Sequence, residues 1–512
     1  MSTLILGILI LLIGGILYGG LCEKVFAPDN RKTPAYAKCD KVDFVPMKKW
    51  KNSLVNLLNI AGTGPILGPI QGILFGPVAF ITIPIGCVIA GAVHDYFCGM
   101  ICTREGGIQM PEMIKRFHKK GVFWFFTVFV SITCFLCGTV FVYTPGDIAA
   151  TQLFGFGGTS GEFSTWLIYG AIFVYYLIAT ILPIDKIIGK IYPLFGALLI
   201  ISAVGIFIML FVTGAPLCDL WGNWNLGGFD FGEYFSTQNF IPAFFVTVAC
   251  GIMSGFHSTQ TALVSRTLEN EKHGRMTFYN MMLCEGFIAM VWAAGTMAVI
   301  GLGAENSGIT MQLTESGWGY FQSVDGVLKQ ISPTSVVGVV CKYMLGDVGG
   351  IIAVIGVIIL PISTGDTAFR SLRLMIAETF RIKQDSVRKR LLLSAGIFVP
   401  AIIVLIWAKN DSNGFNTIWR YFGWANQTVS VFVTSAIMIY LIKNKKTRFV
   451  WIPAIPFLFY SFIVSVYLLN APIGVSLDIG ISYIIGGIFT ALVLAGVLYS
   501  AKTSGGMRKK EI

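Results

Sequence analysis

Long apolar stretches separated by short charged loops make up nearly the whole chain of 512 residues. A helix needs about 20 apolar residues to cross the hydrocarbon core of a bilayer, and a window of that length predicts about thirteen spans here. Their approximate limits are 3–21, 54–76, 77–103, 122–144, 163–183, 190–213, 241–265, 276–301, 347–370, 391–408, 419–441, 449–469 and 480–500. The pattern therefore predicts an all-α polytopic membrane protein with the lipid bilayer as its partner, since a helix satisfies its own backbone in lipid.

The second span is interrupted by residues that break helices. From Ala61 to Pro69 it reads Ala-Gly-Thr-Gly-Pro-Ile-Leu-Gly-Pro, with three glycines and two prolines. Each unsatisfied backbone group in lipid costs several kcal/mol, so such a break is tolerated only where it faces protein or a water-filled cavity. The run predicts a binding site near the middle of the membrane. Its candidate substrate-binding residues are Gly62, Thr63, Gly64 and Pro65.

The seventh span carries a second interruption. Between Ala249 and Gln260, glycines, hydroxyl residues and a histidine break an apolar run, with Gly255, His257 and Ser258 as further candidates for substrate binding. An offset of five spans is odd, so the second broken helix runs in the opposite direction to the first, as in an inverted repeat. The alternative is that these glycines only allow close helix packing, which is common in membranes.

Two units of five helices related in this way resemble the leucine-transporter-like fold of the amino acid–polyamine–organocation superfamily. That arrangement places one additional helix at the N-terminus and two at the C-terminus. The expected divisions are an N-terminal span with a basic loop, the first repeat, an extracellular linker, the second repeat, and a C-terminal helix pair with a basic tail. Their limits are 1–53, 54–213, 214–240, 241–443 and 444–512.

The basic residues predict the orientation of the chain. All but four of its 37 lysines and arginines fall in every second loop, starting with the loop after the first span. The four exceptions are Lys329, Lys342, Lys409 and Arg420. The positive-inside rule then puts those loops and the C-terminus in the cytoplasm, the N-terminus outside, and the protein in the plasma (inner) membrane. The charges do not gather on one domain, so no nucleic-acid partner is expected. Residues 1–21 are expected to stay as a span, because no basic region precedes them as in a signal peptide.

Acids within spans each require a physical reason, since a charge at the bilayer centre costs at least about 2.5–3.5 kcal/mol. At about 1.5 Å per residue, Asp95, Glu285 and His257 all lie about 14–15 Å from the nearest cytoplasmic charge. Each acid is expected to be protonated or partnered across helices, either to carry a coupling proton or as a neutral structural group. His257 is a further candidate to carry the coupling proton. His94 is about 100° round the helix from Asp95 and need not share its environment.

Other polar residues at membrane depth leave alternatives open. Asp366 lies four residues before Arg370, which allows an ion pair, and with Ser363 and Thr364 it is also a candidate for ion coupling. Hydroxyls there can ligate a small cation together with carbonyls freed at the first break. Asn426 and Gln427 must find partners, either a neighbouring backbone or the substrate.

The remaining patterns point away from enzymes and cofactors. The eleven cysteines are scattered, and the Cys134–Cys137 pair has no second cluster that completes a metal site. Spacing shows no phosphate-binding loop, no zinc-protease motif and no nucleophile elbow. We therefore expect no enzyme, no cofactor and no metal site.

Short motifs along most of the chain resemble the carbon starvation A (CstA) family of inner-membrane transporters. They include Gly64-Pro65-Ile66-Leu67-Gly68-Pro69, Ala90-Gly91-Ala92-Val93-His94-Asp95, Gly255-Phe256-His257, Asp366-Thr367-Ala368-Phe369-Arg370 and Phe422-Gly423-Trp424-Ala425-Asn426-Gln427. The resemblance implies nutrient uptake during carbon starvation, as peptide import or proton-coupled pyruvate import.

The combined expectation is a secondary active transporter that imports a small carboxylate-bearing nutrient by proton symport with alternating access. The substrate is expected to be pyruvate or a similar monocarboxylate; the alternative is an oligopeptide or amino-acid importer, with a channel or sensor as more distant rivals. Sodium in place of the proton and the oligomeric state stay open. The outer segments 214–240 and 302–346 are expected to form the extracellular gate, with a short amphipathic helix over 333–345.

Overall fold

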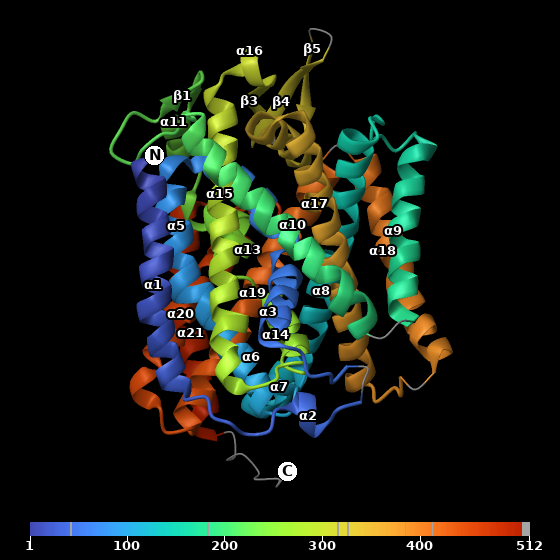
Figure 1. Cartoon of the computed structure of the whole chain (residues 1–512). Helices are drawn as coiled ribbons and strands as arrows, with labels where there is room; N and C mark the ends of the chain where they lie inside the picture. Colours follow the sequence, from blue (N-terminus) through green and yellow to red (C-terminus); the bar gives the residue numbers. More distant parts are fainter. Residues whose placement is uncertain are drawn as a thin grey trace.

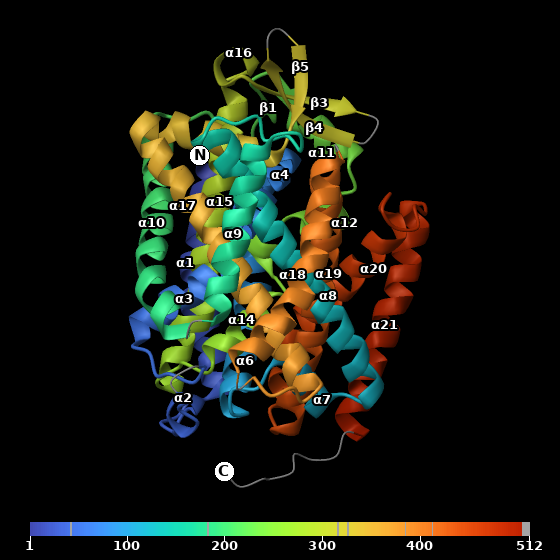
Figure 2. The same cartoon turned by 90° about the vertical axis from the view of Figure 1, so that its right-hand side faces the viewer.

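The computed structural model describes residues 1–40, 43–181, 184–314, 317–324, 327–384, 386–411 and 413–503. Eleven helices of this described part are long and apolar enough to cross a membrane. They stand side by side, with the N-terminus at one end of the bundle and the C-terminal end of the last described helix, Ile479–Thr503, at the other (Figures 1 and 2). The helical membrane fold predicted from the sequence is thereby confirmed. The last residues of the predicted basic tail, from 504 on, lie outside the described residues.

The helices follow the apolar stretches. In the first half of the chain they are α1 Ser2–Phe26, α2 Pro34–Ala37, α3 Lys49–Ala61, α4 Gly64–Gly72, α5 Ala79–Gly86, α6 Ala92–Arg104, α7 Met110–Phe117, α8 Lys120–Ile148, α9 Phe163–Ile181 and α10 Ile184–Val212. In the second half they are α11 Phe231–Thr237, α12 Phe240–Thr247, α13 Ala249–Ile252, α14 His257–Val264, α15 Met281–Gly301, α16 Ala304–Ser307, α17 Pro333–Thr379, α18 Val387–Asn410, α19 Gly414–Lys443, α20 Trp451–Asn470 and α21 Ile479–Thr503. Tighter or wider helical turns join some of them, namely η1 Ile73–Val78, η2 Cys87–Gly91, η3 Ala149–Leu153, η4 Glu271–His273, η5 Arg275–Asn280 and η6 Thr447–Phe449.

The eleven long helices and the thirteen predicted spans divide the same chain differently. The structure runs as one helical stretch over Gly64–Arg104, where the sequence predicted the end of one span and the whole of the next. The predicted span over 241–265 is broken into α12, α13 and α14, each too short to cross alone. The count of thirteen and the inverted repeat stay predictions.

Two small antiparallel sheets lie at the end of the bundle that carries the N-terminus (Figures 1 and 2). One pairs β1 Asn225–Leu226 with β2 Phe229–Asp230. The other has the order β3 Ile309–Thr314, β4 Gly317–Val324, β5 Val327–Ile331, with Tyr320 opposite Met311 and Ile331. The sequence did not reveal these strands, because they are short and lie in loops between spans. The predicted helix over 333–345 is confirmed as the start of α17, which bends at Gly346 (φ 69°).

Burial separates central from peripheral helices. In the most apolar windows of the stretch that ends in α15 and of α19, 83% of the residues are buried, against 28% in α1 and 17% in α21. Apolar side chains on α1 such as Ile16 and Leu17 are 67% and 69% exposed, as expected for a helix that faces lipid. The polar groups of the centre are therefore enclosed by protein.

Candidate functional site

The first predicted break is present. Helix α3 ends at Ala61, Gly62 takes a left-handed conformation (φ 45°) that favours glycine, and α4 starts at Gly64. Gly62, Thr63, Gly64 and Pro65 are all buried. The hydroxyl of Thr63 has no hydrogen-bond partner among the described residues.

The second predicted break is also present. Helix α13 ends at Ile252, Met253 is extended (φ −156°, ψ 130°), and α14 begins at His257. The Ser258 hydroxyl donates to the carbonyl of Gly255 at 2.6 Å, which closes the first turn of α14. Helix α14 is thus a separate piece, with its N-terminal end inside the protein.

The two broken regions touch. A Cβ placed on Gly64 would lie 2.0 Å from the Cβ of Cys250 in α13, so only glycine allows this approach. A Cβ on Gly91 would lie 2.2 Å from the carbonyl oxygen of Ile252. The breaks therefore share one part of the interior.

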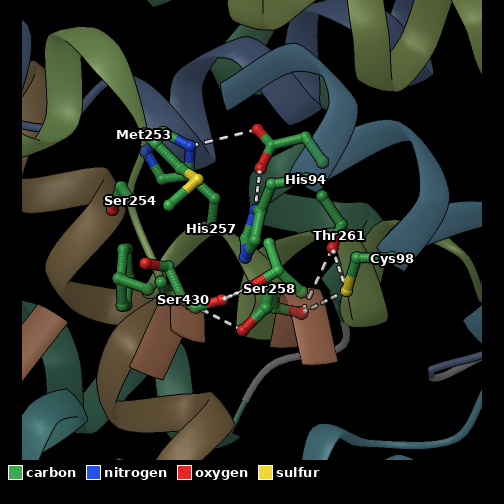
Figure 3. A network of polar contacts seen from close by, with 12 residues as sticks. His94, Cys98, Met253, Ser254, His257, Ser258, Thr261 and Ser430 are labelled. Atoms are coloured by element: carbon green, nitrogen blue, oxygen red, sulfur yellow. Dashed lines mark hydrogen bonds and ion pairs between the residues drawn. The ribbon is translucent and has the colours of Figure 1, made fainter. Parts of the chain in front are cut away.

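Four titratable side chains gather beside the second break. Nδ1 of His94 and Nδ1 of His257 lie 2.7 Å and 3.0 Å from the two carboxylate oxygens of Asp95. Figure 3 shows both imidazoles turned toward this carboxylate. Nε2 of His257 lies 3.5 Å from the Glu285 carboxylate, and all four side chains are 0% exposed. We call this set the acid–imidazole cluster. It joins α6, α14 and α15.

The sequence left open whether His94 and Asp95 share an environment, and the structure shows that they do. Adjacent residues do start about 100° apart on a helix, but both side chains bend toward each other until they are in hydrogen-bond contact. Two π-helical turns, η2 and η5, directly precede α6 and α15, the helices that carry Asp95 and Glu285. Such π-bulges are frequent at functional sites because they rotate the following side chains.

The acid–imidazole cluster has spare capacity to hold protons. Nε2 of His94 and both carboxylate oxygens of Glu285 have no hydrogen-bond partner among the described residues. His94 and His257 both lie within direct proton-transfer distance of Asp95, whereas the 3.5 Å between His257 and Glu285 requires a small movement or one bridging water. Each proton gained or lost changes the buried charge by one.

The candidates for ion coupling on α17 lie elsewhere. The Thr364 hydroxyl donates to the carbonyl of Leu58 at 2.8 Å, just before the first break. The Ser363 hydroxyl donates to its own helix at Leu360, and Asp366 lies 3.8 Å from Arg370 as the spacing predicted. The structure therefore separates the predicted coupling residues into the acid–imidazole cluster and a hydroxyl-rich group beside Gly62.

Asn426 and Gln427 hold the backbone of the second break. Oδ1 of Asn426 accepts the backbone N–H of Phe256 at 2.6 Å, and Nε2 of Gln427 donates to the carbonyl of Met253 at 2.8 Å. Of the two alternatives, the amides thus contact a neighbouring backbone. A contact with substrate stays a prediction.

Sequence reasoning missed a buried charge pair between α8 and α18. Nζ of Lys409 lies 2.5 Å from Oδ1 of Asp147, while Oδ2 accepts the Thr334 hydroxyl at 2.7 Å. Both charged side chains are less than 10% exposed. One sequence feature could have indicated this pair: Lys409 is one of only four basic residues assigned to the outer side.

A bundle of membrane-spanning helices, with two broken helices in contact beside buried acids, defines the class of helical membrane transporters. Within that class the chain belongs to the family of the carbon starvation protein CstA, whose family model matches residues 1–145, 142–315 and 334–467. This confirms the resemblance seen in the sequence.

Relatives include proteins with transport functions. A Haemophilus influenzae membrane protein is 42% identical over 55% of this chain and 87% of that protein. The Escherichia coli peptide transporter CstA is 24% identical over 85% of this chain and 76% of its own length. The pyruvate/proton symporter BtsT of Escherichia coli is also 24% identical, over 85% of this chain and 76% of its own length.

Solved structures show the same fold. The manganese transporter of Eremococcus coleocola matches with a TM-score of 0.56 at 11% identity, covering 91% of this chain and 99% of that one. A Na⁺-coupled sialic acid symporter matches with a TM-score of 0.53 at 15% identity, covering 96% and 97%.

Proposed function

We propose that this protein is a secondary active transporter that imports a small carboxylate-bearing nutrient, pyruvate or a similar monocarboxylate, by proton symport. The observation that carries this proposal is the acid–imidazole cluster, in which His257 of the second break lies between Asp95 and Glu285. A proton bound there changes the charge beside the break. Substrate binding and proton binding would then depend on one another.

Alternating access would move the bound substrate and proton across the membrane, and the proton gradient would set the direction of net transport. The N-terminal ends of α4, near Gly62–Gly64, and of α14 carry partial positive charge and would favour the substrate carboxylate nearby. The N-terminus is expected outside and the C-terminus in the cytoplasm. The superfamily assignment and the inverted repeat are part of the same proposal.

Purified protein in liposomes tests the proposal. A panel of labelled pyruvate, amino acids, dipeptides and tripeptides is offered under an imposed proton or sodium gradient. Accumulation of pyruvate above its external concentration under a proton gradient is expected; equilibration without accumulation would indicate a channel instead. Accumulation of peptides alone would favour the alternative, an oligopeptide or amino-acid importer.

Neutral variants test the coupling residues. Asp95→Asn and Glu285→Gln should abolish uptake driven by the proton gradient while the protein still inserts and folds. The matched control is Asp347→Asn, whose side chain is 81% exposed. If Asp95→Asn and Glu285→Gln both transport like the control, the acid–imidazole cluster does not carry the proton.

Sodium coupling has its own test. Ser363→Ala combined with Thr364→Ala removes the two hydroxyls beside the first break. Loss of a dependence on sodium would assign the coupling ion to that group, with Asp366 as its acid. Unchanged ion dependence would dismiss it.

A further inference from the structure

An outer vestibule of about 570 Å³ opens beside strands β4 and β5. Its walls come from α11, α12, α19, α20, β4 and β5. Gln71 at the end of α4 and Thr247 at the end of α12 also line it. The vestibule therefore leads to the outer ends of both broken helices.

The formal charge on the described lining of the vestibule is positive. Among its described lining residues Arg420, which is exposed, is the only charged side chain, and none of them is an aspartate or glutamate. Within the described part of the chain, Arg420 forms no ion pair or hydrogen bond. Arginine presents a planar fork of donors that matches a carboxylate. A cation without an acid partner in a concave site favours an anionic ligand.

Two tryptophans that line the vestibule have indole N–H donors without an acceptor among the described residues. Trp419 precedes Arg420 on α19, is 5% exposed, and its indole Nε1 has no hydrogen-bond partner among the described residues. The indole Nε1 of Trp318 in β4 is likewise buried and unpartnered there. A buried donor left without an acceptor is costly, so native structures rarely keep one unless water or a ligand supplies the oxygen.

The rest of the lining suits the body of a small organic acid. Phe75, Tyr234 and Tyr467 supply aromatic surface, while Gln238 and Asn470 supply amides. A concave, largely apolar site with a few polar groups is typical of small-molecule binding, and about 570 Å³ lies within its usual size range.

Aromatic rings connect the vestibule to the breaks. Ring centroids are 6.0 Å apart between Trp419 and Phe422, 6.1 Å between Phe422 and Phe141, and 6.1 Å between Phe141 and Phe256. A Cβ on Gly62 would lie 2.7 Å from the Phe141 ring. The rings of Phe422 and Phe141 therefore lie between Trp419 and both breaks.

We propose that the outer vestibule is a carboxylate-recognition site distinct from the breaks. There Arg420 and the indole N–H of Trp419 bind the carboxylate of an arriving solute before it passes the rings of Phe422 and Phe141. This proposal rests on the proposed import of a carboxylate-bearing nutrient. The shared chemistry is the carboxylate, whether it ends a monocarboxylate or a peptide.

Uptake kinetics test the role of Arg420 in the full-length protein. Arg420→Gln should raise KM about tenfold or more for pyruvate or alanyl-alanine, whichever is transported, since it removes a charge-assisted hydrogen bond. Vmax should stay within about twofold, and Arg420→Lys should recover part of the loss. Lys342→Gln is the matched control, because Lys342 is also assigned to the outer side but is 76% exposed and outside the vestibule lining. A KM of Arg420→Gln equal to that of the control overturns the proposal.

A binding measurement separates this proposal from the proposed function. Tryptophan fluorescence of purified protein in detergent is titrated with pyruvate, alanyl-alanine and alanyl-alanine amide, which lacks the carboxylate. Saturable quenching by a carboxylate-bearing compound alone, lost in both Trp419→Phe and Arg420→Gln, supports the site even if no solute accumulates in liposomes. Equal responses to alanyl-alanine and its amide, or quenching that survives in Arg420→Gln, overturn it.

Discussion

The close approach of the two broken helices makes Gly64→Ala a sharp test of the site. Gly64 is not among the glycines with positive φ, so alanine needs no left-handed backbone and keeps its N–H, although Pro65 adds some strain to a helical alanine before it. The added Cβ would lie 2.0 Å from the Cβ of Cys250. Ordinary carbon contacts are about 3.5–4.0 Å, so α4 and α13 must separate by about 1.5 Å.

The expected cost follows from this displacement. Overpacking typically destabilises by about 1–3 kcal/mol, and the helix preference of alanine over glycine offsets up to about 1 kcal/mol. Melting temperatures fall by about 2–4 °C per kcal/mol in domains of 150–250 residues, which sets the scale for a drop of a few degrees. Uptake should fall further than stability, because the N–H groups proposed to hold the substrate move with α4.

Scanning fluorimetry in detergent and uptake in liposomes measure both effects. Gly170→Ala is the matched control, since it lies in α9 with no heavy atom within 4 Å of the new Cβ. If Gly64→Ala melts and transports like Gly170→Ala, the contact between the breaks is not needed, and the reasoning fails.

Three further variants test other contacts. Burial, followed by the nearby Lys443, lowers the pKa of His118 to about 4, so its contribution to stability is complete above pH 6.5 and is lost as the pH falls toward 4. Acidification from pH 7 to 5 should therefore destabilise the wild type by up to about 2 kcal/mol. His118→Gln should lose less stability over the same pH change, as melting at both pH values would show. Asn426→Ala should lower the melting temperature, because it leaves the Phe256 N–H unpaired at a cost of about 1–3 kcal/mol; an unchanged melting temperature would contradict this. Lys409→Met leaves the buried Asp147 carboxylate without its cationic partner and should lower the free energy of unfolding by about 3–5 kcal/mol. Lys342→Met, the exposed control, should leave the free energy of unfolding almost unchanged.

Much of the fold follows from local composition. A run of about 20 apolar residues has no stable alternative in lipid to a helix, so the positions of the spans were predictable. The breaks were predictable for a similar reason, since Gly62, Gly64 and Pro65 in one run do not sustain a helix. The small sheets were not, because strand signals in short outer loops are weak next to the helical pattern.

The candidate site was only partly predictable. The depth of Asp95, Glu285 and His257 could be counted along the chain, and the structure does bring them together. Which of these side chains contact one another could not be predicted from the sequence, because the contacts depend on how α6, α14 and α15 pack and rotate. For the same reason the sequence left open whether His94 shares the environment of Asp95, and the structure shows the two side chains in contact.

The sequence by itself determined the class of protein, the family and the two breaks, because these depend on hydrophobicity, glycine and proline within single segments. The tertiary structure alone decided which buried groups meet. It placed His257 between two acids, assigned Asn426 and Gln427 to the backbone of a break, and left Arg420 in a vestibule whose described lining contains no acid. Contacts between distant segments depend on packing across the bundle, and no local pattern records them.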